Sequence, residues 1–271
     1  MSNLIICVPS YKRPQNFFYE KIVKENPAIA DYIVYFVREE EAVAYTQAMP
    51  LIKPSNIVSI PTGCVTGVGS TREFIRQYMS GLPLNWYCIS DDDVTSIVKA
   101  RYDANKKSHY DGKDVLETLT FISQTLETLP SNCAIGAPQP RAFAKDFDQP
   151  VKVMKTRSPS QIIFYNNRIV KNIPFDLTLF DKHGDDIGYA CQIVASGYDY
   201  FQIPAVVYSC WDSTFSGLLR TPDNFLSIFD QDYENVKQYI PAECLGRAKK
   251  IPFVFLKPKM IHAWRNNEHN N

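Results

Sequence analysis

Short, continuous apolar runs alternate with helical patterns along the first third of the chain. Residues 4–8 and 32–37 are almost entirely apolar, as in strands that are buried on both faces. A helical pattern follows each of these runs, and residues 56–60 form a third β-rich run before a helix expected at residues 70–80. Strands that alternate with helices form parallel sheets that the helices cover. The sequence therefore predicts an α/β fold.

The pattern becomes less regular after residue 93. Further helices are expected at residues 113–128, 185–195 and 224–239, and further strands at 86–90, 134–137 and 200–208. A β-rich region covers residues 151–170, and a last apolar run at 253–256 precedes a polar tail. We expect the sheet to become mixed in this half. No internal repeat or low-complexity linker interrupts the chain, so a single domain over residues 1–271 is expected.

The charge balance limits the partners that the whole surface can select. Lys plus Arg and Asp plus Glu both number 29, so no net field favours a polyanion or an anionic membrane, and a nucleic-acid contact must come from a local patch. The seven cysteines are odd in number and form no C-x-x-C pair, which is typical of reduced thiols. No basic leader and no run of roughly 20 apolar residues is present, so we expect a cytoplasmic protein without a membrane anchor.

Three consecutive carboxylates, Asp91, Asp92 and Asp93, follow the apolar run Trp86-Tyr-Cys-Ile-Ser. Ligands of open α/β sheets bind at the carboxyl ends of the strands. Adjacent acids repel one another, and a divalent cation with oxygen ligands would remove this repulsion. Such a metal could hold the diphosphate of a nucleotide and stabilise it as a leaving group. The alternative is a solvated acidic turn, which rarely follows an apolar strand with so much charge.

The first apolar run ends in the loop Pro9-Ser10-Tyr11-Lys-Arg13-Pro. The final proline can begin the next helix, and the polar loop before it can receive a nucleobase. Tyr11 is expected to stack on the base, and Arg13 to contact a phosphate or the ribose. Taken alone, the segment is equally consistent with an ordinary connection between a strand and a helix.

A glycine-rich segment, Gly67-Val-Gly69-Ser70-Thr-Arg72-Glu73, opens the helix before the acidic strand. Ser70 is expected to be the N-cap, and Glu73 would complete a capping box. The segment is not a dinucleotide-binding fingerprint, because Arg72 takes its third glycine position and the segment follows the third strand. Arg72 and the amides of the helix N-terminus could together bind a diphosphate. A capped helix start without a ligand is the alternative.

An acidic pair, Asp185 and Asp186, begins the helix expected at residues 185–195. A carboxylate at such a position can act as the base that takes the proton of an acceptor hydroxyl in a transfer reaction, and Asp186 is our candidate, with Asp185 beside it. Acidic residues are also common caps of helix starts, which would by itself explain Asp185. Near the end of the chain, His262 could give the metal a nitrogen ligand, although a lone histidine more often has only a structural role.

These segments, in this order, resemble the glycosyltransferases of the GT-A fold in their inverting, family-two-like form. That group carries a first-strand loop of the P-S-Y-x-R-P type, a glycine-rich helix start with an arginine, a D-x-D strand end and an acidic pair before a helix. The resemblance implies a GT-A (Rossmann-like), mixed but mainly parallel sheet flanked by helices. It also implies a nucleotide-binding half at residues 1–98 and an acceptor-binding half, with the C-terminal segment, at 99–271.

The resemblance implies roles for particular residues. Asp91 and Asp93 would bind Mn²⁺ or Mg²⁺ with the diphosphate or ribose of a UDP-sugar, Asp186 would be the base, and His262 would match the C-terminal metal histidine of many such folds. The donor contacts would come from Pro9, Ser10, Tyr11, Arg13, Gly69, Arg72, Asp91 and Asp92. The chain departs from the pattern at Glu73, where asparagine is usual, and it lacks the leucine and arginine usual later in the acidic helix.

A closer resemblance, carried mainly by residues 1–95, is to the TET-associated glycosyltransferases of bacteriophages, which modify hydroxymethylated pyrimidines of DNA. It rests on the segments P-S-Y-K-R-P, G-x-G-S-T-R-E and D-D-D. It implies glucose or a pentose such as arabinose as the sugar, and a hydroxymethyl group of double-stranded DNA as the acceptor, in the cytoplasm of an infected host. This group points into the major groove, so the reaction does not require the base to be flipped out.

Local basic patches are the candidate DNA contacts, although charge runs are commonly only solvated faces. The candidates are Lys99, Arg101, Lys106 and Lys107; Lys152, Lys155, Arg157, Arg168 and Lys171; and Arg247, Lys249 and Lys250, with Tyr165, Trp211 and Phe215 as stacking surfaces.

Other functions are consistent with the same residues. The acceptor could be a glycan or a protein instead of DNA. A sugar nucleotidyltransferase could share the sheet and the metal site, but such enzymes carry a glycine-rich G-T-R loop after the first strand, where this chain has Ser10-Tyr-Lys-Arg. A non-catalytic domain that binds a nucleotide-sugar or DNA is the third alternative. The acid pairs argue against it, because such a domain has no reason to keep repelling carboxylates together.

Overall fold

The computed structural model describes residues 4–15, 18–103, 106–109, 115–140, 152–153, 160–210, 225–247 and 254–268. Within these ranges the main element is a mixed sheet with the strand order β3-β2-β1-β4-β10-β8-β11-β5, and β9 pairs with β11. Its strands are β1 (Leu4–Pro9), β2 (Ile33–Arg38), β3 (Ile57–Ile60), β4 (Trp86–Ser90), β5 (Val94–Lys99), β8 (Cys133–Pro140), β9 (Lys152–Val153), β10 (Ile162–Asn166) and β11 (Asp199–Cys210).

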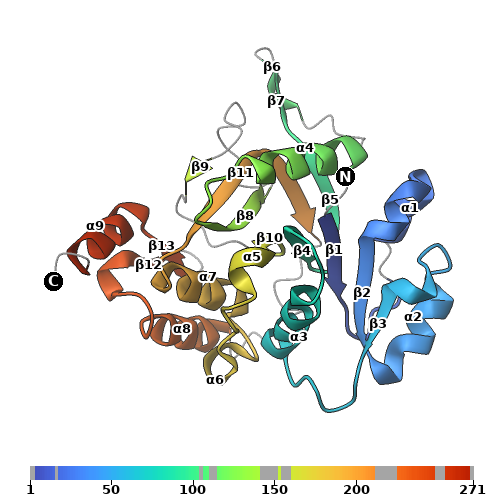
Figure 1. Ribbon diagram of the computed structural model, residues 1–271, viewed down its shortest axis with the longest axis horizontal. Helices are drawn as coiled ribbons and strands as arrows, with labels where there is room; N and C mark the ends of the chain where they lie inside the picture. The colour runs from blue at the N-terminus through green and yellow to red at the C-terminus, as the bar shows by residue number, and fades with distance from the viewer. Residues whose placement is uncertain are drawn as a thin grey trace.

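Helices cover both faces of this sheet (Figure 1). They are α1 (Phe18–Glu25), α2 (Ala42–Ala48), α3 (Val68–Ser80), α4 (Val115–Glu127), α5 (Asn167–Val170), α6 (Leu177–Phe180), α7 (Asp185–Ala195), α8 (Phe225–Val236) and α9 (Pro258–Glu268). Short 3-10 helices lie at Pro27–Tyr32, Glu39–Glu41, Pro54–Asn56 and Ala242–Cys244, and two small hairpins pair β6 (Arg101–Asp103) with β7 (Lys106–His109) and β12 (Leu245–Arg247) with β13 (Val254–Leu256).

The first four strands of the sheet order are parallel to one another. β1 pairs with β2 on one side and with β4 on the other, and β2 pairs with β3. The carboxyl ends of these strands therefore share one edge of the sheet, where ligands of α/β folds bind. The rest of the sheet is mixed, because β10 runs antiparallel to β4 and β8, and β11 is parallel to β8 but antiparallel to β5. The predicted α/β fold and the predicted change to a mixed sheet are both confirmed.

The sheet has a buried apolar cluster on each face. Successive residues of a strand point to opposite faces, so Ile6 packs under α1, α2 and α4, whereas Cys7 packs under α3, α5 and α7. Both faces are apolar, which explains why the strands read as continuous apolar runs in the sequence.

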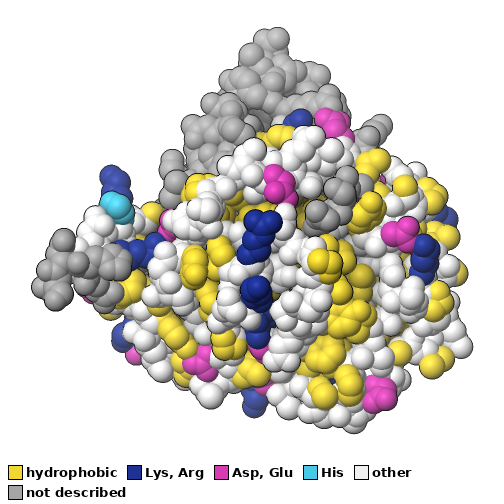
Figure 2. All heavy atoms as spheres, in the orientation of Figure 1, with side chains coloured by type: hydrophobic (Ala, Val, Ile, Leu, Met, Phe, Trp, Pro, Cys, Tyr) yellow, Lys and Arg dark blue, Asp and Glu magenta, His cyan; other side chains and the backbone are white. Residues whose placement is uncertain are grey.

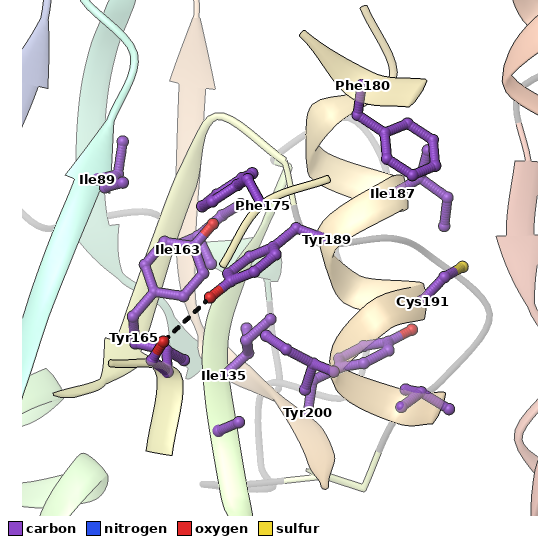
Figure 3. Close-up of a cluster of buried hydrophobic side chains, with 14 of the residues drawn as sticks. Ile89, Ile135, Ile163, Tyr165, Phe175, Phe180, Ile187, Tyr189, Cys191 and Tyr200 are labelled. Atoms are coloured by element: carbon purple, nitrogen blue, oxygen red, sulfur yellow. Dashed lines mark hydrogen bonds between the residues drawn. The ribbon is translucent and has the colours of Figure 1, made fainter. Parts of the chain in front are cut away.

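Tyr165 on β10 belongs to the cluster beneath α7. Its ring lies 5.4 Å from the ring of Tyr87 and 5.8 Å from that of Tyr189, and Phe175 stacks on Tyr189 at 3.7 Å (Figure 3). Tyr165 is only 1% exposed. The expectation that Tyr165 offers a stacking surface to DNA is therefore wrong, because strand alternation turns its side chain into the core.

The elements that differ from the sequence prediction include β5, α5 and α9. β5 forms directly after the acidic run and pairs with β11. Within the region expected to be β-rich, Asn167–Val170 is helical, because the side chain of Asn166 accepts a hydrogen bond from the amide of Arg168 and ends β10. The expected polar tail contains α9, which buries Ile261 and directs Arg265 at Asp199, with 2.6 Å between Nη1 and Oδ1.

No helix within the described ranges is both long and apolar enough to cross a membrane. The cysteines are free thiols, as expected from their number and spacing. Cys64 is exposed and Cys210 is half-buried, and the others are buried among apolar side chains: Cys7, Cys88, Cys133, Cys191 and Cys244.

Candidate functional site

The carboxyl edge of the parallel strands brings together segments that are far apart in the sequence. The acidic run from Asp91 to Asp93 follows β4, and the loop of residues 10–13 follows β1. The first turns of α3 and α7 face the same edge, since Arg72 on α3 contacts acids of both β4 and α7. These four segments, each of which carries residues expected at a site from the sequence, therefore lie together.

Arg72 holds three carboxylates at once. Its Nη2 lies 2.9 Å from Oδ1 of Asp91, its Nε 2.6 Å from Oδ2 of Asp185, and its Nη1 2.8 Å from Oδ1 of Asp186. The contact with Asp91 is a hydrogen bond, and the contacts with Asp185 and Asp186 are ion pairs without hydrogen-bond geometry. Only 2% of the Arg72 side chain is exposed. We call Asp91, Asp93, Asp185 and Asp186 the acid cluster.

The acid cluster carries more negative charge than Arg72 neutralises. Burial raises the pKa of Asp91 well above its ordinary value of 3.8; Arg72 opposes this rise, and the other acids of the cluster add to it. The Asp91 carboxyl therefore retains a proton more readily than an ordinary aspartate. A divalent cation at this position would displace that proton and relieve the repulsion among the acids.

The loop after β1 is bound to the middle aspartate of the run. Ser10 donates a hydrogen bond from Oγ to Oδ2 of Asp92 at 2.5 Å, and Nη1 of Arg13 lies 2.9 Å from Oδ1 of the same carboxylate. The hydroxyl of Tyr45 on α2 contacts Ser10 Oγ at 2.7 Å and accepts a hydrogen bond from the Arg13 amide at 3.0 Å. These contacts fix the loop that begins at Pro9 against the acidic run, so Ser10 and Arg13 lie beside Asp92.

Tyr11 lies in the same loop, half-buried, with cations near its ring. The guanidinium carbon of Arg38, at the end of β2, lies 4.2 Å from the ring centroid, and Lys12 Nζ lies 4.9 Å from it. Lys12 has a positive φ of 56°, and its amide donates to both carboxylate oxygens of Glu41 at 3.1 Å. The loop is thus held by Glu41, which precedes α2, and Tyr11, which was expected to stack on a nucleobase, lies beside Arg38.

The glycine-rich segment has a structural role that the sequence did not reveal. A Cβ at Gly67 would lie 2.1 Å from the carbonyl oxygen of Asp181, and a Cβ at Gly69 2.2 Å from that of Phe180. The glycines therefore let the chain after α6 approach the start of α3. The amides of Gly69 and Ser70 donate at 2.8 Å to the carbonyl and to Oδ1 of Asp181, respectively. Thus Gly69 and Arg72, which were expected to bind the donor, have partners within the chain.

The predicted capping pattern of α3 is wrong. The N-cap is Gly67, and Ser70 lies at the third helical position, where its Oγ accepts the Gly67 amide at 2.9 Å. Glu73 instead pairs with Arg76, 2.6 Å away, and accepts the amide of Phe175 at 3.0 Å. The carboxylate of Asp181, which is distant in the sequence, binds the amide of Ser70 in place of the capping residue expected next to the helix.

α7 begins after Gly184, whose φ of +69° only glycine adopts readily. Asp185 is therefore the first helical residue and not the cap. Next to this turn lies a pair that the sequence analysis missed: Nδ1 of His183 is 2.5 Å from Oδ1 of Asp232 on α8, and the Asp232 side chain is 5% exposed. A Cβ at residue 184 would lie 2.3 Å from the same oxygen. The segment His-Gly-Asp-Asp could have drawn attention to His183 in the sequence, but nothing in this segment identifies Asp232 as its partner.

The acidic run suits a cation that binds together with a substrate. Oδ1 of Asp91 is directed at Arg72, and its second oxygen has no hydrogen-bond partner in the described chain. The described residues contain no group of three or more His, Cys, Asp or Glu side chains arranged to hold a metal ion. Mg²⁺ is commonly bound by one or two carboxylates, with substrate phosphates and water completing its shell. Asp91 and Asp93 fit a metal of this kind.

His262 does not join the acidic run. It is exposed on α9, with Nε2 3.3 Å from Nδ2 of Asn266 on the same helix. Figure 1 shows α9 at one end of the molecule, with α7 between it and β4.

Two of the expected basic contacts lie at the opposite edge of the sheet. Asn166 at the end of β10 is opposite Trp86 at the start of β4, so α5, with Arg168 and the adjacent Lys171, is at the amino end of β4. A strand of five residues spans about 16 Å. Arg168 and Lys171 therefore lie too far from Asp91 to contact the same chemical group of a ligand. On the face shown in Figure 2, some of the coloured Lys and Arg side chains form a narrow column near the middle and the others are scattered, without a broad basic patch.

The other basic candidates give little further support. Lys99 lies 3.7 Å from Glu117 and over the ring of Phe121, and Arg247 pairs with Asp230. The side chains of Arg101, Lys106, Lys107 and Lys152 are not described, and Lys155, Arg157, Trp211, Phe215, Lys249 and Lys250 lie outside the described residues.

Comparison with known proteins identifies relatives of the chain. A profile of the family described as TET-associated glycosyltransferase matches residues 4–212. No curated protein matches the sequence. Among solved structures, glucosyl-3-phosphoglycerate synthase from Mycobacterium tuberculosis in complex with Mg²⁺ and UDP has a TM-score of 0.51 and 9% identity, over 90% of this chain and 82% of that chain. S. aureus TarS 1–349 in complex with UDP-GlcNAc has a TM-score of 0.49 and 10% identity, over 89% and 68%. The likeness to the synthase shows the GT-A fold.

Proposed function

The chain belongs to the TET-associated glycosyltransferase family, and we propose that it transfers glucose or a pentose such as arabinose from a UDP-sugar to a hydroxyl group, with inversion at the anomeric carbon. The proposal includes a requirement for Mn²⁺ or Mg²⁺. It also includes the acceptor, the hydroxymethyl group of a modified pyrimidine in double-stranded DNA. The synthase of similar fold is complexed with Mg²⁺ and UDP, which makes UDP-sugars the first donors to test.

The contact of Arg72 with three acids is the observation that supports the proposal most. Asp91 lies on the donor side, at the end of β4, and Asp185 and Asp186 lie on the acceptor side, at the start of α7. Because one guanidinium contacts all of them, a leaving group held at Asp91 and a hydroxyl held at Asp186 would be held near one another. Transfer between two bound groups depends on such proximity.

The donor nucleotide would bind along the edge formed by β1 and β4. Ser10, Arg13 and Asp92 form one hydrogen-bonded unit there, which would contact the ribose and base, with Tyr11 beside the base. Asp91 and Asp93 would hold the metal and the diphosphate. When bound, the metal would neutralise charge on the departing diphosphate.

Asp186 would act as the base of the transfer. Its carboxylate accepts the proton of the acceptor hydroxyl while that oxygen forms a bond to the anomeric carbon and the bond from this carbon to the diphosphate oxygen breaks. Arg72 fixes the orientation of Asp186 through a contact of 2.8 Å. In this proposal Arg72 orients the acids and does not bind the diphosphate itself.

Mass spectrometry of the products tests the proposal. UDP-glucose, UDP-arabinose and other UDP-sugars are offered with Mn²⁺ or Mg²⁺ to DNA that contains 5-hydroxymethylcytosine or 5-hydroxymethyluracil, with unmodified DNA, glycan and protein acceptors alongside. We expect a mass increase of one sugar on hydroxymethylated DNA, and loss of it in Asp93→Ala and with EDTA.

Other outcomes would replace the proposal with one of its alternatives. Transfer only to a glycan or a protein would show that the acceptor is not DNA. Release of pyrophosphate from a sugar phosphate and UTP would identify a nucleotidyltransferase, and binding without turnover of any donor would identify a non-catalytic domain.

A further inference from the structure

Gln161 lies directly opposite Asp91 at the carboxyl edge of β4. In the antiparallel pair of β10 and β4, Ile162 is opposite Ser90, so the preceding residue faces the first acid of the run. The Asp91 amide donates a hydrogen bond to the carbonyl of Gln161 at 2.7 Å. The backbone of Gln161 therefore forms one wall of the region next to the acid cluster.

The backbone conformation of Gln161 is unusual. Its φ is +59°, in the left-handed region that costs energy for residues with a Cβ and that glycine or asparagine adopts more readily. A residue that served only to turn the chain would be expected to be one of those two. Non-glycine residues in this region concentrate at functional sites, where the side chain has a use that offsets the strain.

The side chain of Gln161 has no hydrogen-bond partner among the residues that the structure describes. This side chain is half-buried. A carboxamide both donates and accepts hydrogen bonds, so a ligand with several hydroxyl groups would satisfy it. Neither packing nor an internal hydrogen bond accounts for glutamine at this strained position.

The neighbours of Gln161 connect the donor and acceptor sides of the site. Ser160 Oγ lies 3.0 Å from the hydroxyl of Tyr208 on β11. Burial raises the pKa of Tyr208, and the negative charges of Asp186 and Asp91 add to the rise. The Asp91 amide is bound to Gln161, and Arg72 joins Asp91 to Asp186, so the start of β10 lies next to the place where the proposed function puts the ring of the transferred sugar.

We propose that Gln161 is a specificity-determining residue whose carboxamide hydrogen-bonds to a hydroxyl of the transferred sugar, next to Asp91. This inference rests on the proposed function and adds to it a residue that discriminates between donor sugars. It predicts that the choice of donor depends on the side chain of Gln161 and not on its backbone conformation.

The variants Gln161→Gly and Gln161→Asn separate the side chain from the backbone. Both residues adopt the left-handed conformation readily, but only asparagine keeps a carboxamide. We expect both variants to melt at or above the wild-type temperature and to bind UDP as the wild type does, because UDP has no sugar. Loss of one hydrogen bond in Gln161→Gly should lower kcat/KM for the preferred UDP-sugar about 10-fold, and Gln161→Asn should lose less or change the sugar preference.

Deoxy-sugar donors identify the hydroxyl concerned. The wild type and Gln161→Gly are compared on the preferred UDP-sugar and on its 2-deoxy, 3-deoxy, 4-deoxy and, for a hexose, 6-deoxy forms. The inference is supported if the kcat/KM of the two proteins differs for the parent sugar and for every deoxy form except one. For that one deoxy form the two kcat/KM values should be equal. The inference is overturned if the kcat/KM of Gln161→Gly equals that of the wild type for every donor, or if it is lower by the same factor for all of them.

Failure of the proposed function gives a different result. A wild-type protein that uses no UDP-sugar refutes the proposed function and this inference together. A wild type that uses a UDP-sugar, with Gln161→Gly behaving in one of the two contrary ways, refutes only the assignment of Gln161.

Discussion

Arg72 places one guanidinium among acids from two distant segments. Charged groups as buried as this side chain, which is 2% exposed, are stable only when they are paired, and removing one partner of a buried ion pair costs about 3–5 kcal/mol. The contacts hold Asp91 at the end of β4 and Asp186 at the start of α7 in one arrangement. Arg72 thus links the two sides of the proposed reaction.

Arg72→Lys should impair catalysis more than it impairs folding. Lysine keeps the positive charge, but a single ammonium cannot reproduce three contacts with fixed directions. Loss of one charged hydrogen bond, at about 1.5–3 kcal/mol, corresponds to a fall of about 10- to 100-fold in kcat/KM. Steady-state kinetics with the preferred donor, together with thermal melting, measures both effects.

Arg76→Lys is the matched control. Arg76 lies one turn further along α3, is also buried, and pairs with Glu73 and the carbonyls of Val170 and Lys171. This variant should lower the melting temperature while kcat/KM changes by less than about 3-fold. Equal losses of activity in the two variants would show that Arg72 acts only through stability.

The residues of the acid cluster were predictable from the sequence, but their partners were not. Asp91 and Asp186 each adjoin a recognisable element, an apolar strand and an amphipathic helix. Arg72 pairs with these acids, and Asp92 is bound by Ser10 and Arg13. Both sets of contacts depend on distances between segments, which local sequence patterns do not encode.

At the scale of elements, the start of α3 is stabilised from a distance. Asp181 lies 111 positions from Ser70 in the sequence, yet its carboxylate accepts the Ser70 amide, where a negative charge is favourable at a helix N-terminus. Thr66 adds a second hydrogen bond to the same carboxylate at 2.5 Å. This contact joins α3 to the loop before α7 and so supports the position of the acidic pair.

Asp181→Asn should destabilise the protein at neutral pH and less so in acid. Burial would raise the pKa of Asp181, but hydrogen bonds from Ser70 and Thr66 outweigh it and hold the pKa below its ordinary 3.8. A lowered pKa means that the carboxylate stabilises the fold above about pH 3.8, and that this contribution is lost as the pH falls through the folded-state value.

Urea denaturation at pH 7, 5 and 3 measures this effect. Asparagine can still accept a hydrogen bond, and loss of a negative charge at a helix N-terminus costs about 0.3–1 kcal/mol, so the free energies of unfolding of wild type and Asp181→Asn should differ by about this amount at pH 7 and 5. The difference should shrink at pH 3. A difference that stays the same at pH 3 would mean that the charge of Asp181 is not what stabilises α3.

Elements with strong local patterns were predicted well, and those that depend on tertiary contacts were not. The boundaries of β4 and α7 match the expected ranges, because an apolar run and an amphipathic pattern define them locally. α9 has a largely polar sequence and is held by Ile261 and Arg265. The N-cap of α3 was misassigned because its stabilising carboxylate comes from another part of the chain.

At the scale of the whole molecule, the sheet gathers the proposed chemistry at one edge. Its parallel strands bring the loop after β1, the acidic run and the start of α3 together, and the mixed part adds Gln161 and α7 to the same place. The basic residues near α5 lie at the other edge. A DNA acceptor would therefore approach from the side of the acid cluster, through side chains other than Arg168 and Lys171.

Asp186→Asn tests the central claim most directly, because it removes the proposed base while keeping the size of the side chain. The measurement is the rate of sugar transfer to the identified acceptor, with the affinity for UDP determined on the same sample. General-base catalysis contributes about 10²- to 10⁴-fold, so we expect transfer to fall by that factor while the Kd for UDP changes little. Transfer at the wild-type rate would contradict the account, since Asp186 would then not be the base.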